Sequence, residues 1–281
     1  MTPAQSAACL GNSPLPSFDE IAEMFAALAV QAGLAVMKVY GEAFTHRTKA
    51  DHSPVCDADE QSEAIILLGL ALHLPNVPVL AEEAASRGVI PLCGKSMILV
   101  DPLDGTREFL GRNGEFTVNI ALVIDGIPQA GAVYAPALQK LWFAGQHAFV
   151  CDVAPGADLP ARSDWRGIHV RPAPSGALVA LASRSHSDVE TEAYLARLPV
   201  CERRSAGSSL KFCELAEGAA DVYPRFGPTM EWDTAAGDAV LRAAGGAVLL
   251  QDGTPLLYGK AASNYRNSAF IAWGDASAAI L

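Results

Sequence analysis

Apolar side chains recur at helical spacing in two early stretches of the chain. Residues 17–40 open on Ser-Phe-Asp-Glu, which is typical of a capping box, and residues 57–74 open on acidic side chains and end before Pro75. We expect a helix in each stretch. The polar residues 48–54 lie between these helices, and residues 1–16 are expected to form a flexible tail.

Short apolar runs predict strands at residues 77–81, 97–100, 116–124 and 130–135, the last two joined as a hairpin through Asp125-Gly126. After a Pro- and Gly-rich connector at 155–174, we expect strands at 178–182, 221–223, 247–250 and 269–273. Helices are expected at 188–198, 208–217 and 232–244. Antiparallel strands with helices, followed by α/β units, predict an α+β layered fold. We expect an N-terminal α+β half at 17–150 and a C-terminal α/β half at 151–281.

Composition limits the function classes. The 281 residues are 51% hydrophobic, enough for a large core, and the net charge of −11 argues against nucleic-acid binding. The six cysteines form no C-x-x-C pair, which favours reduced thiols in a cytoplasmic protein. Glu23, Gln31 and Lys38 interrupt the first apolar helix, which indicates a core helix, and we expect no integral membrane segment. Peripheral association with the inner membrane face stays open.

The sequence Asp101-Pro-Leu-Asp-Gly-Thr106 follows the apolar run 98–100 and places two carboxylates three residues apart. Two nearby anionic groups repel each other unless a cation lies between them, and carboxylate oxygens are preferred ligands of Mg²⁺. A metal-dependent phosphate site is one interpretation. An ordinary turn, in which each Asp accepts backbone hydrogen bonds, is the alternative.

Acidic residues stand at strand ends, at a helix start or in the polar loop, where side chains can converge: Asp51, Glu82, the Asp101/Asp104 pair and Asp233. Such a cluster suits metal-assisted hydrolysis of a phosphate monoester. Taken singly, Asp51 could form a turn, Glu82 could be solvated, and Asp233 could complement a helix N-terminus.

Eight blocks match one family in order, from about Lys49 to the end of the chain. They are KADHSPV at 49–55, VLAEE at 79–83, LVDPLDGTREF at 99–109, NGEFTVNIA at 113–121, SRSH at 183–186, GSSLKFC at 207–213, YPRFGPT at 223–229 and WDTAAG at 232–237. On these motifs the chain resembles the inositol monophosphatase superfamily and, within it, the bacterial 3′(2′),5′-bisphosphate nucleotidase branch of the CysQ type. The resemblance implies a layered αβαβα fold with the metal site between two halves.

The resemblance also implies a ligand set for two Mg²⁺ ions. Glu82, Asp101 and the backbone carbonyl of Leu103 look like the ligands of one ion. Asp101, Asp104 and Asp233 look like the ligands of a second. The resemblance further implies inhibition by Li⁺ through competition with Mg²⁺.

By the same resemblance, Asp51 and Thr106 orient or deprotonate the attacking water, and Glu82 belongs to this catalytic group. A third, weaker Mg²⁺ at Asp51 stays open. Gly105 and Thr106, if they begin a helical turn, would offer backbone N–H groups to phosphate oxygens.

A second substrate phosphate needs cations away from the metals. Lys211 and Arg225 meet this need, since Arg binds phosphate bidentately and Lys acts as a point charge. The resemblance places Ser208, Lys211 and Arg225 at the nucleotide and His186 near the adenosine. The alternatives are a solvated Lys211, a structural Arg225 and a His186 that caps its helix.

The expected reaction is hydrolysis of adenosine 3′,5′-bisphosphate to AMP and phosphate, with 3′-phosphoadenylyl sulfate as a further substrate and a role in sulfate assimilation. Inositol or sugar monophosphate hydrolysis and a non-catalytic nucleotide sensor are the rivals. The partner is thus a small phosphorylated nucleotide, and either a monomer or a homodimer is compatible with the composition.

Three positions depart from the family pattern. Cys56 stands where Thr is usual, Ala84 where an acid is common, and Glu231 where an apolar residue is common. We expect Glu231 either to shift metal affinity at the neighbouring Asp233 or to point to solvent.

Overall fold

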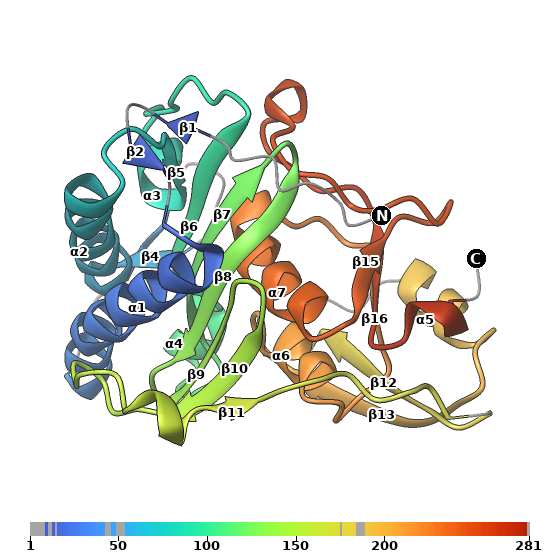
Figure 1. Cartoon of the computed structure of the whole chain (residues 1–281). Coiled ribbons are helices and arrows are strands. Elements are labelled where there is room, and N and C mark those ends of the chain that lie inside the picture. The colour runs from blue at the N-terminus through green and yellow to red at the C-terminus, as the bar shows by residue number, and fades with distance from the viewer. Residues whose placement is uncertain are drawn as a thin grey trace.

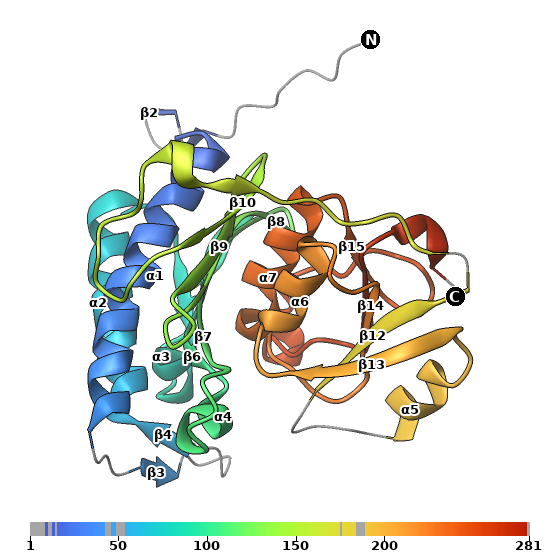
Figure 2. The same ribbon diagram turned by 90° about the horizontal axis from the view of Figure 1, so that it is seen from below.

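The computed structural model describes residues 9–10, 13–14, 16–42, 46–48, 54–174, 176–183 and 189–279. Figure 2 shows five layers, which alternate helices and sheets. They are helices α1 (Phe18–Gly41) and α2 (Asp57–His73), a seven-stranded sheet, helices α6 (Leu210–Ala216) and α7 (Glu231–Ala243), a five-stranded sheet, and helix α5 (Val189–Leu195). This order confirms the predicted αβαβα fold.

Helix α1 begins at the predicted capping box. The Ser17 hydroxyl accepts a hydrogen bond from the Glu20 N–H at 3.3 Å, and the Glu20 carboxylate accepts one from the Ser17 N–H at 2.8 Å. By length and composition α1 could cross a membrane, but 50% of its most apolar stretch is buried inside the fold. Its buried face packs on the seven-stranded sheet beside α2 (Figure 1), as the sequence predicts for a core helix.

The seven-stranded sheet has the order β11-β10-β9-β8-β7-β6-β5. Only β5 and β6 run parallel; the other neighbours are antiparallel. The bounds are β5 (Val79–Ala81), β6 (Ser96–Asp104), β7 (Thr117–Ile124), β8 (Ile127–Ala135), β9 (Lys140–Ala144), β10 (Ala148–Asp152) and β11 (Arg166–Gly167).

The five-stranded sheet has the order β13-β12-β14-β16-β15. Strand β12 runs parallel to both of its neighbours, and β16 runs antiparallel to both of its own. The bounds are β12 (Leu178–Ser183), β13 (Val200–Ala206), β14 (Val222–Arg225), β15 (Ala247–Leu249) and β16 (Phe270–Trp273).

Smaller elements complete the described part of the chain. They are β1 (Cys9–Leu10) with β2 (Ser13–Pro14), β3 (His46–Thr48) with β4 (Pro54–Cys56), helices α3 (Glu82–Ser86) and α4 (Thr106–Leu110), and the 3₁₀ turns η1 (Arg162–Asp164), η2 (Ala261–Ser263) and η3 (Ala276–Ala278). The predicted division of the chain at residue 150 stays a prediction; β10 crosses this position.

Several elements were not predicted from the pattern. Strand β13 is an edge strand whose residues are mostly exposed, so its sequence Val-Cys-Glu-Arg-Arg-Ser-Ala lacks an apolar alternation. Strands β9 and β10 are apolar runs of five residues, too short to assign by periodicity. Helix α3 has only five residues and follows β5 directly.

Helix α7 lies between the two sheets and packs closely against β8. It approaches β8 so closely that a Cβ added at Gly131 would lie 3.0 Å from the carbonyl oxygen of Ala236 and 2.9 Å from the Cβ of Ala239. Glycine therefore allows the helix to rest directly on the sheet. Helix α7 also contacts β6, and its N-terminal turn carries Asp233.

Candidate active site

The Asp101/Asp104 pair lies on a bulge in β6. Asp101 pairs with Asn119 and Asp104 with Thr117, so three steps along β6 match two steps along β7. Side chains three residues apart in a regular strand would point to opposite faces, whereas the extra residue here returns both carboxylates to one face. The strand predicted to end at residue 100 thus continues to Asp104 and contains a bulge.

The bulge is held by polar contacts. The Asp101 carboxylate accepts a hydrogen bond from the Leu103 N–H at 3.1 Å, and the Pro102 carbonyl accepts one from the Ser62 hydroxyl at 2.7 Å. The Thr106 hydroxyl donates to the Leu103 carbonyl at 3.4 Å. The carbonyl that the resemblance assigned to a metal therefore lies beside the Thr106 side chain.

Glu82 is the first residue of α3, directly after β5. The buried Glu63 carboxylate on α2 accepts hydrogen bonds from the N–H groups of Glu83 at 2.7 Å and Ala84 at 3.2 Å. Glu63 also pairs with Arg87 at 3.0 Å. Burial raises the pKa of Glu63 despite these donors. Sequence reasoning missed Glu63, because an acid inside a predicted helix gives no signal of a contact with a segment twenty residues away.

Asp104 is surrounded by hydroxyl and amide donors from both halves of the molecule. Its Oδ2 accepts from Ser208 at 2.6 Å, Ser209 at 3.3 Å and Asn119 at 3.5 Å. The Thr117 and Ser208 hydroxyls share a further hydrogen bond of 2.5 Å. Burial raises the pKa of Asp104, and the Ser208 hydrogen bond and the nearby Lys211 charge oppose that rise.

Asp233 lies in the first turn of α7, and its Oδ2 accepts the Met230 N–H at 2.8 Å. Burial raises the pKa of Asp233 well above its ordinary value, and the negative charges of Asp104 and Glu82 raise it further. The structure thus brings Glu82, Asp104 and Asp233, which are distant in sequence, close enough to repel one another. That repulsion is what a bound cation would remove.

The donor chemistry of this cluster fits Mg²⁺, because every side chain in it offers carboxylate oxygen. Across residues 9–10, 13–14, 16–42, 46–48, 54–174, 176–183 and 189–279, no group of three or more His, Cys, Asp or Glu side chains lies in an arrangement that could hold a metal ion. Asp233 lies close enough to Asp104 and Glu82 for their negative charges to raise its pKa, but these carboxylates do not form one tight group.

A cavity of about 260 Å³ opens between β6, α4, α6 and α7. Its lining brings together most of the residues that the sequence predicted for substrate and metal: Asp104, Gly105, Thr106, Ser208, Lys211, Arg225 and Asp233. Gly105 adopts a φ of +88° before α4, with Glu115 O only 3.2 Å from where a Cβ would lie.

Two buried cations line this cavity. The Lys211 ammonium donates to the carbonyls of Ala206 at 3.0 Å and Ser208 at 2.5 Å, and burial lowers its pKa to about 8. The Arg225 guanidinium donates to the Pro228 carbonyl at 3.0 Å, whereas its buried Nε has no hydrogen-bond partner among the described residues. Lys211 is 4% exposed, so its alternative as a solvated side chain is wrong.

Asp51 and His186, which the resemblance assigned to water activation and to the adenosine, lie outside the described residues. Their roles stay predictions. The Cys56 side chain also lies outside the described side chains.

Glu231 corrects one expectation. It is fully buried and does not point to solvent. Its carboxylate accepts hydrogen bonds from the backbone N–H groups of Gly259 at 2.7 Å and Lys260 at 2.9 Å, and it is absent from the cavity lining. Its side chain is therefore engaged with the 257–267 loop.

Comparison with known proteins agrees with this geometry. The model of the inositol monophosphatase family matches residues 17–276. The 3′(2′),5′-bisphosphate nucleotidase CysQ of Escherichia coli K12 is 46% identical over 233 residues, which are 82% of this chain and 91% of that protein.

Solved structures give the same result. The crystal structure of CysQ from Bacteroides thetaiotaomicron, a bacterial member of the inositol monophosphatase family, superposes with a TM-score of 0.76 and 38% identity, covering 91% of this chain and 97% of that one. A lithium chloride-soaked inhibitory complex of staphylococcal inositol monophosphatase-1 shares the fold, with a TM-score of 0.72 at 18% identity over 93% of this chain and 92% of that one. Members of this family are metal-dependent phosphatases. On the family match and the CysQ relatives together, the chain belongs to the inositol monophosphatase family.

Proposed function

We propose that this protein hydrolyses the 3′-phosphate of adenosine 3′,5′-bisphosphate to give AMP and phosphate. The observation that carries the proposal is one cavity lined by the acids Asp104 and Asp233 and by the buried cations Lys211 and Arg225. The acids suit a metal-bound scissile phosphate, and the cations suit a second phosphate on the same substrate. The CysQ relatives at 46% identity support the nucleotide as that substrate.

We propose Mg²⁺ as the metal, two or three ions per site, held by Glu82, Asp101, the Leu103 carbonyl, Asp104 and Asp233. Bound Mg²⁺ would neutralise the carboxylates, polarise the phosphoryl oxygens and acidify a water molecule. The repulsion that raises the pKa of Asp233 supports this ligand set. We also expect Li⁺ to inhibit this protein, since lithium chloride gives an inhibitory complex of the staphylococcal enzyme, which has the same fold.

Two side chains complete the proposed chemistry. Asp51 would accept a proton from the attacking water, with the Thr106 hydroxyl orienting that water from its position beside the Leu103 carbonyl. Gly105 caps α4 and Thr106 is its first residue, and both would direct backbone N–H groups at a phosphate oxygen. Catalysis would then rest on positioning and charge stabilisation.

The second phosphate would be bound by Lys211 and Arg225, with Ser208 at the nucleotide and His186 near the adenosine. The Lys211 ammonium has three donors, of which two contact carbonyls. The unpartnered Nε of Arg225 would gain an acceptor from such a phosphate. We propose 3′-phosphoadenylyl sulfate as a further substrate, a role in sulfate assimilation, and a cytoplasmic location.

The test is phosphate release from a substrate panel with Mg²⁺: adenosine 3′,5′-bisphosphate, inositol 1-phosphate, fructose 1,6-bisphosphate and AMP. We expect the highest kcat/KM for the adenosine bisphosphate. A higher kcat/KM for inositol 1-phosphate or the sugar bisphosphate would contradict the proposal, and no turnover of any compound would favour the sensor.

A pair of variants tests the second-phosphate assignment. Lys211→Ala with Arg225→Ala should reduce bisphosphate hydrolysis and leave monophosphate turnover unchanged. Arg203→Ala is the matched control, since this Arg pairs with Glu192 on the surface and lies outside the cavity. Parallel loss of both activities in the double variant would count against nucleotide contact.

A further inference from the structure

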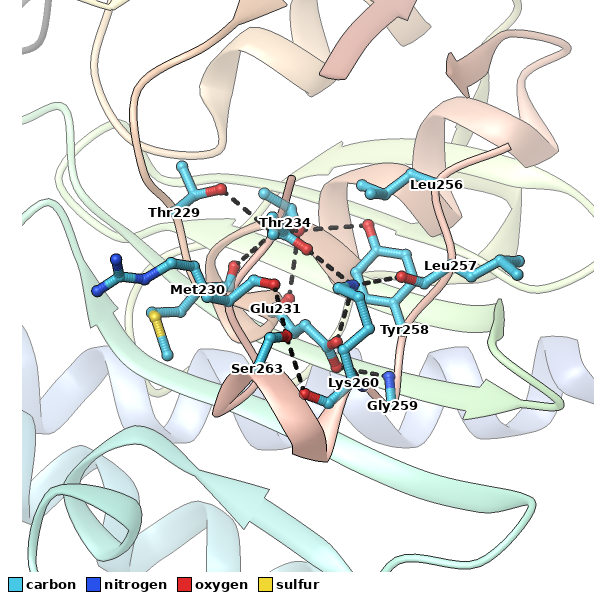
Figure 3. Close-up of polar contacts among 12 residues, drawn as sticks. Thr229, Met230, Glu231, Thr234, Leu256, Leu257, Tyr258, Gly259, Lys260 and Ser263 are labelled. Atoms are coloured by element: carbon cyan, nitrogen blue, oxygen red, sulfur yellow. Dashed lines mark hydrogen bonds and ion pairs between the residues drawn. The ribbon is translucent and has the colours of Figure 1, made fainter. Parts of the chain in front are cut away.

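The Glu231 carboxylate is fully buried and has three donors (Figure 3). Its Oε2 accepts the Gly259 N–H at 2.7 Å, and its Oε1 accepts the Lys260 N–H at 2.9 Å and pairs with the Lys260 ammonium at 2.8 Å. A buried carboxylate is tolerated only with such compensation. All three donors come from the 257–267 loop, far from Glu231 in the sequence.

Lys260 organises the other side of this contact. Its ammonium also donates to the Leu257 carbonyl and, at 3.2 Å, to the Asn267 side chain. The Glu231 N–H in turn donates to the Tyr265 carbonyl at 2.9 Å. Both the first and the last part of the 257–267 loop are thereby tied to the first residue of α7.

Asn267, at the end of the same loop, contacts residues on both sides of Asp233. Its amide donates to the Met230 carbonyl at 2.8 Å and to the Thr234 hydroxyl at 2.9 Å. Met230 provides the N–H that Asp233 accepts, and Thr234 follows Asp233 directly. The loop therefore holds the residues on both sides of the Asp233 carboxylate.

We propose that Glu231 and Lys260 are positioning residues that fix the N-terminal turn of α7 and so set the divalent-cation affinity of Asp233. This inference rests on the proposed metal role of Asp233. The hydrogen bonds from the 257–267 loop to Met230, Glu231 and Thr234 fix the backbone on both sides of Asp233 and so fix where its carboxylate can meet a cation. The Lys260 charge also neutralises Glu231, which would otherwise add a negative charge two residues from Asp233.

The test compares Glu231→Gln and Lys260→Met with the wild-type chain. The Mg²⁺ midpoint, which is the Mg²⁺ concentration at half-saturation in a calorimetric titration at fixed temperature, reports cation binding without any substrate. Partners behind metal ligands change metal affinity by about 10- to 100-fold, so we expect each variant to need about tenfold more Mg²⁺. Lys260→Met keeps the apolar part of the side chain, so this variant still tests the proposal if Glu231→Gln does not fold.

Asp221→Asn is the matched control. Asp221 is also a buried carboxylate with one cationic partner, Arg171 at 2.7 Å, and a backbone donor, Val179 N–H at 2.7 Å. It lies directly before β14 and outside the cavity lining. We expect it to lower the Tm in chelator while leaving the Mg²⁺ midpoint unchanged.

Two outcomes of the comparison between the variants would overturn the positioning role. One is a wild-type Mg²⁺ midpoint in both variants despite a lower Tm, and the other is an equal shift in Asp221→Asn. A wild-type chain that binds Mg²⁺ with the expected difference between variants, yet hydrolyses no bisphosphate, would overturn the proposed function and support the positioning role. A wild-type Tm that does not respond to Mg²⁺ would overturn both.

Discussion

The Ser208 hydroxyl donates a 2.6 Å hydrogen bond to Asp104 Oδ2 across a separation of 104 residues. Ser208 precedes α6 in the middle layer, and Asp104 ends β6 in the seven-stranded sheet. Ser208 holds this position with a φ of +52°, in the left-handed region that costs a residue with a side chain about 1 kcal/mol or more. A strained backbone is therefore retained where it delivers a hydroxyl to a candidate metal ligand.

Replacing Ser208 by Gly should separate strain from function. Glycine accepts a positive φ without penalty, so we expect Ser208→Gly to unfold at the same or a higher urea concentration than the wild type. Asp104 loses its shortest hydrogen bond in this variant, so kcat/KM should fall about tenfold. Ser208→Ala retains the strain and should show the same kinetic loss with lower stability. Wild-type kinetics in both variants would exclude a role for the hydroxyl.

Asp233→Asn should reduce activity and stabilise the metal-free protein. Losing the proposed metal ligand would remove several kcal/mol of transition-state stabilisation, so we expect kcat/KM to fall about 100-fold or more. Because the folded-state pKa of Asp233 is raised, the folded protein at neutral pH must either desolvate the Asp233 charge beside Asp104 and Glu82 or bind a proton there, and both cost free energy. Asn removes that charge and can still accept the Met230 N–H, so urea unfolding in chelator should require more urea.

The matched control for this variant is Asp158→Asn, which changes an exposed carboxylate. It should alter neither measurement. A metal-free Asp233→Asn protein that is less stable than the wild type would contradict the repulsion inferred among the three acids.

The pKa of Lys211, about 8 in the folded protein, predicts an alkaline limit to bisphosphate hydrolysis. The ammonium is present below this pH and is lost above it, so kcat/KM should decline as the pH rises beyond about 8. Lys211→Arg should move this decline to higher pH, because a guanidinium stays protonated. If the alkaline decline of kcat/KM stays at the same pH in Lys211→Arg, another group causes it.

Loss of stability through Lys211 would not explain this fall of kcat/KM at alkaline pH. Burial lowers the folded-state pKa of Lys211 from 10.5, so between about 8 and 10.5 the unfolded chain binds more protons than the folded chain at this site. The free energy of unfolding contributed by Lys211 therefore rises with pH across that window. Urea unfolding at pH 8 and pH 9.5, compared with Lys211→Met, measures this contribution.

We expect Glu63 to affect Mg²⁺ binding by holding the start of α3, where Glu82 lies. Glu63→Ala removes the acceptor of the Glu83 and Ala84 N–H groups, frees the start of α3, and should raise the Mg²⁺ midpoint about tenfold. Glu63→Gln retains an acceptor oxygen and should have a smaller effect. Arg87→Ala removes only the ion pair with a half-exposed guanidinium, so its effect on stability should stay below about 1 kcal/mol. Equal Mg²⁺ midpoints in all three variants would contradict this role.

The sequence alone determined the layers and the chemical character of the site. Helix α1 begins at its capping box, and the β7–β8 hairpin turns at Asp125-Gly126, because these signals depend on neighbours within a few residues. The prediction that Glu82, Asp104 and Asp233 share a metal site came from acids placed at element ends in a recognised motif order, and it stays a prediction.

Only the tertiary structure decided how those side chains are held. The bulge that puts Asp101 and Asp104 on one face depends on pairing with β7, and the contacts that hold the helix of Glu82 and the Asp104 carboxylate come from α2 and from the turn before α6. The sequence left two roles open for Glu231, a shift of metal affinity at Asp233 or exposure to solvent. In the structure its carboxylate contacts the 257–267 loop. Burial and hydrogen-bond partners arise from segments that are distant in sequence, and local spacing carries no information about which of them will meet.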